Sequence, residues 1–414
     1  MPKKPRHGGG SQRRGDPAPA PVAAVAVEAP AEERASSPDA LPHVVAIGAS
    51  AGGLAALKTF FAHVPPDGAV AYVVVMHLSP EYESHLDELL QPHIKMPVHQ
   101  VKEPIGIEKG RVYVIPPNFN LEVTGTQLRL RQLEPGRHLR APVDHFFCSL
   151  ADAFGDHATG IVLSGTGSDG AIGLRRIKEC GGLAVVQDPA EAEYDGMPRN
   201  AVADGLVDLV LPLEKIPHAV LQYAQTKPRL PVPAHEQEDA KGEARQFLQK
   251  VVAQVRARTG RDFSHYKQAT LLRRIARRMQ FTHLQEAIAY LALLRADPGE
   301  VKALADDFLI TVSSFFRDPE MFEILERDVV PRLFDGKGPG DTVRVWSVGC
   351  ATGEEAYSLA ILLLQEADRR GSQATIQVFA TDLHTQALEK ARAGFYSDAV
   401  EADVGPERLQ RFFR

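Results

Sequence analysis

The 414-residue sequence has few cysteines, no long hydrophobic run and little net charge. Its three cysteines lie far apart and form no C-x-x-C pair, which excludes a disulfide framework and a cysteine zinc site. No run approaches the ~18 apolar residues that a membrane-spanning helix needs. The formal net charge of −6 argues against a general nucleic-acid binder. We therefore expect a cytoplasmic protein with no metal site, no membrane insertion and no nucleic-acid partner.

With 44% hydrophobic and 24% charged residues, the composition is typical of a globular protein. The length of 414 residues suggests two or three domains. Residues 1–42 have a basic start and an Ala/Pro-rich continuation, which loosely imitates a secretory signal. Because prolines and Glu28 interrupt the apolar part, we expect a disordered tail instead. Residues 226–243 are rich in proline and charge and are expected to form a linker.

Between the tail and the linker, residues 43–225 alternate between strand-like and helical patterns. This alternation predicts an α/β domain with a doubly wound, mostly parallel sheet covered on both faces. A polar stretch at 119–133 predicts an antiparallel hairpin at its edge. The expected strands are 44–47, 70–76, 111–115, 160–163, 183–186 and 206–211, and the expected helices are 53–63, 83–91, 144–154, 170–179 and 215–225.

The segment 48–53, GASAGG, follows the first expected strand directly and precedes a helix. It contains G-x-S-x-G, in which a sharp strand-to-helix turn presents a serine, here Ser50. Amides at the start of the helix would favour negative charge, either a developing oxyanion or a phosphate. Two interpretations therefore remain open for this turn, a hydrolytic nucleophile and a nucleotide cradle.

Two further residues favour the nucleophile. His77 ends the second expected strand, and Asp169 lies in a glycine-rich loop after the fourth. Because the carboxyl ends of parallel strands share one edge, Ser50, His77 and Asp169 can meet there as nucleophile, general base and orienting carboxylate. A dinucleotide site would instead place an acidic residue where His77 stands, and G-x-G-x-x-G is absent.

Beyond the linker, residues 244–316 show only helical periodicity and predict a small all-α domain. Residues 317–414 predict a partial Rossmann-like domain with strands at 343–348 and 375–380. Two strands with their helices bury too little for a complete core, so we expect this unit to be incomplete or the sequence to be a fragment. A small-residue loop follows the first strand, and Asp382 closes the second, where it could hold ribose hydroxyls.

The helix expected at 266–279 has an apolar stripe opposite an arginine stripe. Such a stripe is usually a solvated face, yet four clustered guanidinium groups also suit an acidic partner surface. The arginines are Arg273, Arg274, Arg277 and Arg278.

The motifs GASAGG, VVVMHLSP, LSGTGSDGAIGLRRIKECGG and QDPAEAEYDGMPRNA resemble the CheB family of chemotaxis protein-glutamate methylesterases over residues 43–220. The resemblance implies a catalytic triad of Ser50, His77 and Asp169, with backbone amides of Ala51 and Thr166 receiving the oxyanion. It also implies hydrolysis of glutamyl methyl esters on chemoreceptors, with glutamine deamidation as a related activity, and no cofactor.

The motifs SSFFRDP, GCATGEEAYSLA and FATDLHTQALEKARAGFY resemble the CheR glutamate O-methyltransferases, which use S-adenosylmethionine. This resemblance covers 244–414 and implies that the arginine helix binds the cytoplasmic helices of methyl-accepting chemoreceptors. The cofactor contacts that it implies are Thr311, Ser313, Arg317, Glu355 and Asp382. The chain is thus expected to be a CheB–CheR fusion for sensory adaptation. The alternatives are a non-catalytic scaffold and a regulator of a sensory pathway other than chemotaxis.

Overall fold

The computed structural model describes most of the chain beyond residue 40, so nearly all of the expected tail lies outside it. Two of the expected site residues, His77 and Thr311, also lie outside the described residues. None of the helices described is long and apolar enough to span a membrane. The described ranges are 41–66, 68–76, 86–132, 141–203, 207–233, 240–309, 313–396 and 400–414, without the side chains of Gln132 and Ala402.

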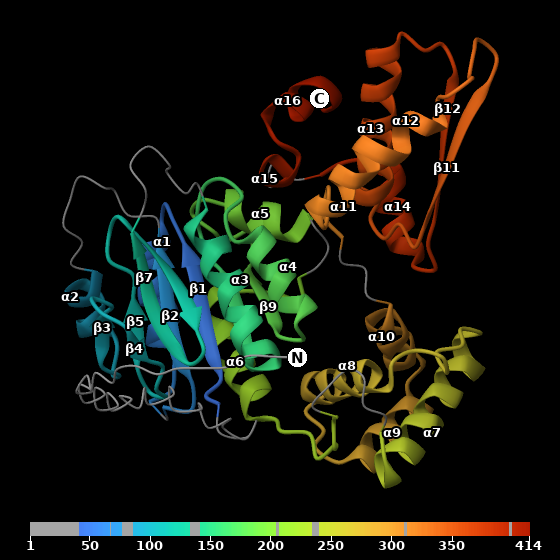
Figure 1. The fold of residues 1–414 in the computed structure, drawn as a ribbon. Helices are drawn as coiled ribbons and strands as arrows, with labels where there is room; N and C mark the ends of the chain where they lie inside the picture. The colour runs from blue at the N-terminus through green and yellow to red at the C-terminus, as the bar shows by residue number, and fades with distance from the viewer. Residues whose placement is uncertain are drawn as a thin grey trace, which may run out of the picture. The chain divides into compact units, whose positions relative to one another are not determined.

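A parallel seven-stranded sheet forms the centre of the first part of the chain (Figure 1), in the order β10-β9-β8-β1-β2-β5-β3. The predicted α/β class with a mostly parallel sheet is therefore confirmed. The central strands are continuous apolar runs because both of their faces are buried. The strands are β1 Val44–Ala49, β2 Ala71–Met76, β3 Val98–Gln100, β5 Val112–Val114, β8 Ala158–Val162, β9 Leu183–Gln187 and β10 Leu209–Leu211.

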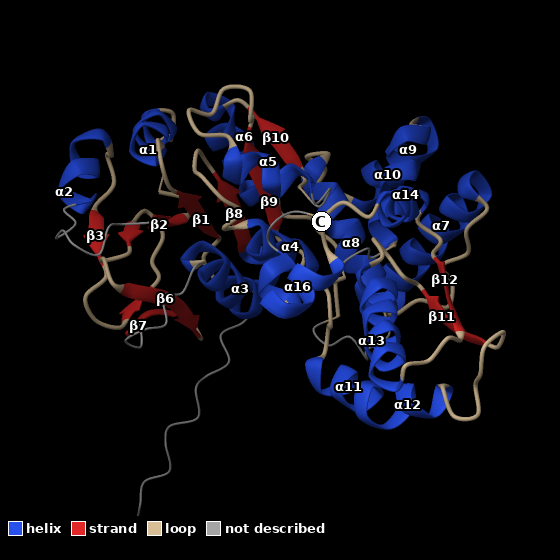
Figure 2. Ribbon diagram, turned by 90° about the horizontal axis from the view of Figure 1, so that it is seen from above, coloured by secondary structure: helices blue, strands red, loops and turns tan. Residues whose placement is uncertain are grey.

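Helices cover both faces of this sheet (Figure 2). Alternate residues of β1 contribute to two separate cores, with Val45 and Ile47 facing α1, α2 and α6, and Val44 and Ala46 facing α3, α4 and α5. The hairpin forms as predicted, but it does not join the edge of the main sheet: with the short strand β4 it makes a separate three-stranded sheet, whose apolar side chains pack into the second core. The elements are α1 Gly53–Ala62, α2 Leu86–Leu90, α3 Pro142–Phe154, α4 Ala171–Glu179, α5 Gly196–Ala203, α6 Ile216–Gln225, β4 Ile105–Gly106, β6 Phe119–Thr124 and β7 Gln127–Gln132.

The order of the strands determines where a site can form. The chain runs outward from β1 through β2 to the edge strand β3, adds β5 between β2 and β3, and then returns to form β8, β9 and β10 on the other side of β1. The direction of winding therefore reverses between β1 and β8. In open α/β sheets, ligands bind outside the carboxyl ends of the strands at this reversal.

Four helices follow the linker and share one apolar core, as the helical periodicity predicts. They are α7 Gly242–Thr259, α8 Gln268–Phe281, α9 Ala287–Ala296 and α10 Pro298–Phe308. Helix α9 does not continue directly from α8, because His283 takes a left-handed conformation at φ 55° and separates the two helices.

The last part of the chain contains two paired parallel strands, β11 Thr342–Val348 and β12 Thr375–Thr381. One face of the pair packs on α13, whereas Trp346, Val348 and Phe379 on the other face are more than half exposed. Residues 319–333 form one continuous helical segment, in which a π-helical turn lies just before Pro331, which has no N–H for a regular ladder. The helices are α11 Pro319–Ile324, α12 Val330–Leu333, α13 Glu354–Arg370, α14 Thr385–Ala393, α15 Glu401–Val404 and α16 Pro406–Phe412.

Candidate active site

Ser50 lies at the carboxyl end of the central strand β1, at the reversal point of the sheet. Its backbone N–H donates to the carbonyl of Ser164 (3.0 Å), which continues the pairing of β1 with β8 beyond the regular ladder. All residues of β1 are buried, whereas Ser50 is partly exposed. The chain therefore leaves the core at this serine and presents it at the rim of the sheet.

The turn after Ser50 differs from a strained nucleophile elbow. The N–H of Gly53 donates to the carbonyl of Ser50 (2.8 Å) and closes a four-residue turn. The left-handed position in this turn belongs to Gly52, at φ 72° and ψ −6°, while Ser50 has no positive φ. These angles fit the third residue of a type II turn, which favours glycine. The glycine thus takes the unusual conformation, and the serine keeps an ordinary backbone.

Asp169 lies in the loop after β8, next to β1, and its carboxylate is almost fully buried. One oxygen accepts the N–H of Val143 (3.0 Å) and the other accepts the N–H of Asp144 (2.8 Å). Both donors belong to the first turn of α3, where backbone amides lack helical partners and the helix dipole favours negative charge. The loop therefore places an anionic side chain at the rim, anchored by a helix start.

A second buried carboxyl group, Asp144, is coupled to Asp169. Its Oδ1 accepts the N–H of Gly173 (2.7 Å) in the first turn of α4, so the two aspartates bind the starts of two neighbouring helices reciprocally. Burial, followed by the charge of Asp169, raises the pKa of Asp144 to about 8. Asp144 is therefore mostly neutral at pH 7, which leaves Asp169 as the charged member of the pair.

Close packing around Gly165 brings the loop after β8 against Ser50. A Cβ atom added at Gly165 would lie 2.9 Å from the Cβ of Ser50 and 2.1 Å from the Sδ of Met197. The carbonyl of Gly165 also accepts the N–H of Met197 (2.9 Å), and its own N–H donates to Tyr194 (2.9 Å). Only glycine fits here, because the segment before α5 folds over this loop.

The third member of the predicted triad, His77, directly follows β2, whose last residue Met76 pairs with Ala49. The side chain of His77 lies outside the described residues. The strands that precede Ser50, His77 and Asp169 are thus the centre of the sheet and its two immediate neighbours.

The predicted cofactor residues are divided between different surroundings. Asp382 lines a cavity of about 460 Å³ with Gly349 and Thr381, and the helical domain contributes Tyr266, Phe308 and Leu309 to its wall. The carboxylate of Asp382 accepts the N–H groups of Ala351 (2.9 Å) and His384 (2.7 Å). One side chain therefore links the loops after β11 and β12.

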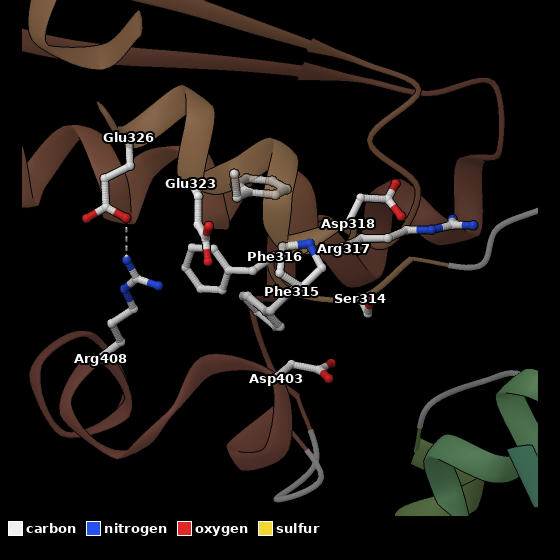
Figure 3. A pocket seen from close by; sticks show the side chains of 11 residues that line it. Ser314, Phe315, Phe316, Arg317, Asp318, Glu323, Glu326, Asp403 and Arg408 are labelled. Carbon is white, nitrogen blue, oxygen red and sulfur yellow. Dashed lines mark hydrogen bonds and ion pairs between the residues drawn. The ribbon is translucent and has the colours of Figure 1, made fainter. Parts of the chain in front are cut away.

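Arg317 lines a different cavity of about 430 Å³, shown in Figure 3, where Arg408 reaches Glu326 at 3.1 Å and stacks over the Phe316 ring. Glu355 accepts a hydrogen bond from the Ser347 hydroxyl (2.8 Å) at the end of β11. Neither Ser313 nor Arg317 nor Glu355 lines the cavity of Asp382. Of the four predicted contacts that the structure describes, Asp382 alone lines this cavity.

Three families match successive stretches of the chain. The CheB methylesterases match residues 45–220, the all-alpha domain of the CheR methyltransferases matches 246–309, and the SAM-binding domain of the CheR methyltransferases matches 311–414. A putative protein-glutamate methylesterase/protein-glutamine glutaminase of Leptospira interrogans is 36% identical over 182 residues, which cover 44% of this chain and 94% of that protein. The chain belongs to the CheB methylesterase family. With the two CheR regions, it is a CheB–CheR fusion.

Longer relatives share this relationship. A 104.1 kDa protein of Rhodobacter capsulatus is 38% identical over 343 residues, which cover 78% of the CheB–CheR chain but only 36% of that protein. The protein-glutamate methylesterase/protein-glutamine glutaminase of Pyrococcus horikoshii is 35% identical over 185 residues, 44% of this chain and 50% of that protein. The crystal structure of the Thermotoga maritima CheB methylesterase catalytic domain matches 44% of this chain and 98% of its own, at 26% identity and a TM-score of 0.41.

The structure corrects the expectation that the arginine stripe of the CheR-type helix α8 is an open face. Arg274 is 8% exposed and Arg277 is 3% exposed, so half of the stripe is buried. Arg278 is bound through two nitrogens to Glu300 at 3.0 and 2.6 Å. These side chains therefore form neither the docking face nor the solvated face that the pattern suggested.

Other residues of the site were not identified from the sequence. In the sequence, Asp144 is one acidic residue in an amphipathic helix. Only the packing of α3 on α4 shows that it is buried beside Asp169. Tyr266 and Phe308 look like ordinary core aromatics of the helical region, and nothing in their spacing points to a cavity shared with Asp382.

Proposed function

We propose that the CheB-type domain of this chain hydrolyses glutamyl methyl esters on chemoreceptor helices, with deamidation of glutamine as a related acyl reaction. The observation that supports this most directly is the position of Ser50. Its partly exposed side chain stands at the reversal point of a parallel sheet, packed against the loop that carries Asp169. A substrate that approaches the rim would meet a hydroxyl group on a rigid strand end.

In the proposed mechanism, Ser50 attacks the ester carbonyl while His77 removes the hydroxyl proton. Asp169 orients the imidazole and stabilises the imidazolium that forms, and the amides of α3 hold its carboxylate. His77 then protonates the departing methoxide, which leaves as methanol, and a water molecule that His77 activates hydrolyses the acyl ester on Ser50 to release the free glutamate. A neutral Asp144 supports this arrangement because it adds no second negative charge beside Asp169.

The oxyanion would be received by the backbone amides of Ala51 and Thr166. Among the hydrogen bonds of the described residues, none uses either of these two N–H groups as a donor. Ala51 directly follows Ser50, and Thr166 directly follows Gly165, which packs against the Cβ of Ser50. In other acyl-transfer enzymes, removal of one such donor lowers the rate by about 10²–10³.

The test is release of methanol from methylated receptor fragments by the full chain. We expect Ser50→Ala to lower the rate by about 10⁴-fold or more, because the nucleophile is lost while the fold is retained. Ser168→Ala is the matched control, since it removes a hydroxyl from the loop of Asp169 and should leave the rate within about threefold of wild type. Full turnover by Ser50→Ala in a folded protein would disprove the assignment.

The scaffold alternative makes a different prediction for a chemical probe. A serine-directed phosphonate should label wild-type protein at Ser50 and leave Ser50→Ala unlabelled. Folded wild-type protein that is not labelled and releases no methanol would favour a non-catalytic scaffold. Labelling without activity on receptor fragments would instead favour a substrate from another sensory pathway.

We further propose that the CheR-type part of the chain binds S-adenosylmethionine for methyl transfer to glutamate. The match to the SAM-binding family and the cavity beside Asp382, whose volume suits a ligand of this size, support this proposal. When bound, the cofactor would supply the methyl group. Asp382 would bind its ribose hydroxyls, and Gly349 would let it lie close to the backbone. The proposed contacts of Thr311, Ser313, Arg317 and Glu355 rest on the motif resemblance.

Calorimetric titration of the full chain with S-adenosylmethionine tests this second proposal. Asp382→Asn should weaken binding by about tenfold or more, because a charged acceptor for hydroxyl groups is lost. Asp368→Asn, on the distal end of α13, is the control and should bind as wild type does. Equal affinity of Asp382→Asn and wild type would contradict this role for Asp382.

A further inference from the structure

The arginine helix α8 makes specific contacts with the esterase domain, which neither proposed enzymatic activity requires. Arg274 donates to the carbonyls of Lys178 (3.3 Å) and Glu179 (3.4 Å), and Arg277 donates to that of Gly182 (3.3 Å). These carbonyls end α4 and begin the turn that leads into β9. The last carbonyls of a helix lack intrahelical donors and lie at the negative end of its dipole, so two guanidinium groups suit them well.

A buried ion pair lies at the centre of the same contact. The guanidinium of Arg277 pairs with Asp208, just before β10, and the exposed fractions of the two side chains are only 3% and 5%. Asp208 also binds Lys178 at 2.9 Å and accepts the N–H of Ala184 at 2.9 Å. Asp307 on α10 approaches Arg277 from the helical side, at 3.4 Å.

These partners satisfy the buried charges, which is the condition under which such groups are tolerated in an interior. Burial alone would raise the pKa of Asp208, but the charges of Arg277 and Lys178 hold it below its usual value. Loss of Arg277 would leave the buried Asp208 with Lys178 as its cation, and loss of Asp208 would leave Arg277 with Asp307 at 3.4 Å.

Aromatic packing continues the contact at the carboxyl end of α8. The ring of Phe281 lies 5.3 Å from that of Tyr223 on α6, and the guanidinium of Arg277 lies 5.0 Å from the Phe281 centroid. Phe281 packs against one of the two cores of the esterase sheet. The side chain of Gln280 donates to the carbonyl of Thr226 at 3.3 Å. The contact therefore combines an apolar part, a charged part and backbone acceptors, as a built interface does.

We propose that Arg274 and Arg277 join the helical domain to the esterase domain, and that an acidic partner of the chain does not use these two side chains. The contact is called the α8 seam here and consists of Arg274, Arg277 and Phe281 against α4, Asp208 and Tyr223. The seam binds the two enzymatic halves through the helix whose sequence resembles a receptor-docking element. An acidic partner that meets the helical domain does so through other cations.

Hydrogen exchange of the full chain tests the seam with a charge swap. Arg277→Asp and Asp208→Arg should each speed amide exchange at least tenfold in both Gln268–Phe281 and Leu183–Gln187, with no change in Val44–Ala49. The double variant restores the pair with its charges reversed and should recover most of the protection. Arg245→Asp on α7, an exposed arginine of the same helical domain, is the control and should exchange as wild type does. Asp208→Asn serves in place of Asp208→Arg if that variant fails to fold.

Binding of a glutamate-rich helical peptide, measured by fluorescence anisotropy, distinguishes the seam from a docking face. The seam predicts that Arg277→Asp binds this peptide within about twofold of wild type. Unchanged exchange in both segments, or a tenfold loss of peptide binding with unchanged exchange, would overturn the proposal. Because neither measurement uses ester hydrolysis or methyl transfer, failure of the seam and failure of the proposed activities are distinguishable.

Discussion

Asp144 and Asp169 are two carboxyl groups in one buried space, and their charges differ because their surroundings differ. Asp169 accepts two amides at the start of α3, which stabilise its anion, whereas Asp144 is shielded from water and lies beside that anion. Burial and a neighbouring charge raise the pKa of Asp144, and acidic groups perturbed in this way are common at catalytic sites. The arrangement has a measurable effect on stability.

Asp144→Asn should remove a pH dependence of folding. The pKa of Asp144 is about 8 in the folded chain and ~3.9 in an unfolded chain, so the folded state binds more protons between these values. The free energy of unfolding should therefore fall as the pH rises from about 4 to about 8, by up to ~1.4 kcal/mol per pH unit. Urea unfolding at several pH values should show this slope for wild type and a smaller slope for Asp144→Asn.

Asp152→Asn, at an exposed position of the same helix α3, is the matched control and should keep the wild-type slope. A slope that is equal in Asp144→Asn and wild type would mean that Asp144 is ionised in the folded state at neutral pH.

Sequence reasoning reaches some of these residues and not others for a physical reason. Ser50 and Asp169 follow apolar runs at strand ends, so local pattern predicts both their element and their edge of the sheet. Asp144 depends on how two helices pack, and helical periodicity carries no information on that contact. The local sequence pattern also did not predict the conformation of the turn after β1, because either Ser50 or Gly52 could have taken the left-handed position.

Among the elements, α8 differs most from its expected role. The spacing of its apolar residues correctly predicted the helix and its core face. The partners of the opposite stripe come from α4, from α10 and from Asp208 before β10, which are distant in the sequence, so no local pattern specified them. Similarly, the short strand β3 and the helix α5 were missed, because three residues show no periodicity and α5 contains Gly196 and Pro198.

Arg278→Ala should destabilise the helical domain. Its guanidinium binds the Glu300 carboxylate through two nitrogens, and the exposed fraction of the Glu300 side chain is only 6%. The tyrosine hydroxyl of Tyr290 also donates to Glu300 at 2.7 Å, so the carboxylate would remain buried with one partner lost. We expect the free energy of unfolding to fall by about 2–4 kcal/mol, measured by urea denaturation.

Arg256→Ala on α7 is the comparison, since the exposed fraction of its side chain is 65% and its ion pair with Asp262 is open to solvent. Its effect should stay below ~1 kcal/mol. Equal effects of the two substitutions would show that burial of Glu300 does not control the stability of this domain.

At the scale of the whole molecule, the sheet of β11 and β12 exposes an apolar face. Trp346 pairs directly with Phe379, and Val348 lies on the same face two residues along β11. Both strands are also edges, with backbone groups available for further pairing. We expect the chain as given to self-associate at micromolar concentration through this face.

Sedimentation velocity tests this expectation on the chain. The variant Val348→Thr/Phe379→Thr should shift the population toward monomer, because threonine suits a strand and removes apolar surface. Val210→Thr, at an exposed position of β10, is the control and should leave the distribution unchanged. A wild-type chain that stays monomeric at high concentration would contradict the expectation.

The two-sided pairing of β1 affects how the proposed nucleophile would be lost. With β8 on one side and β2 on the other, this strand has no free edge, and its six residues are buried throughout. Segments held in this way open only when a domain melts as a unit, not by local fraying. On heating, the proposed activity of Ser50 should therefore be lost at the temperature at which the surrounding sheet unfolds. No lower temperature range should exist in which the domain is folded but inactive.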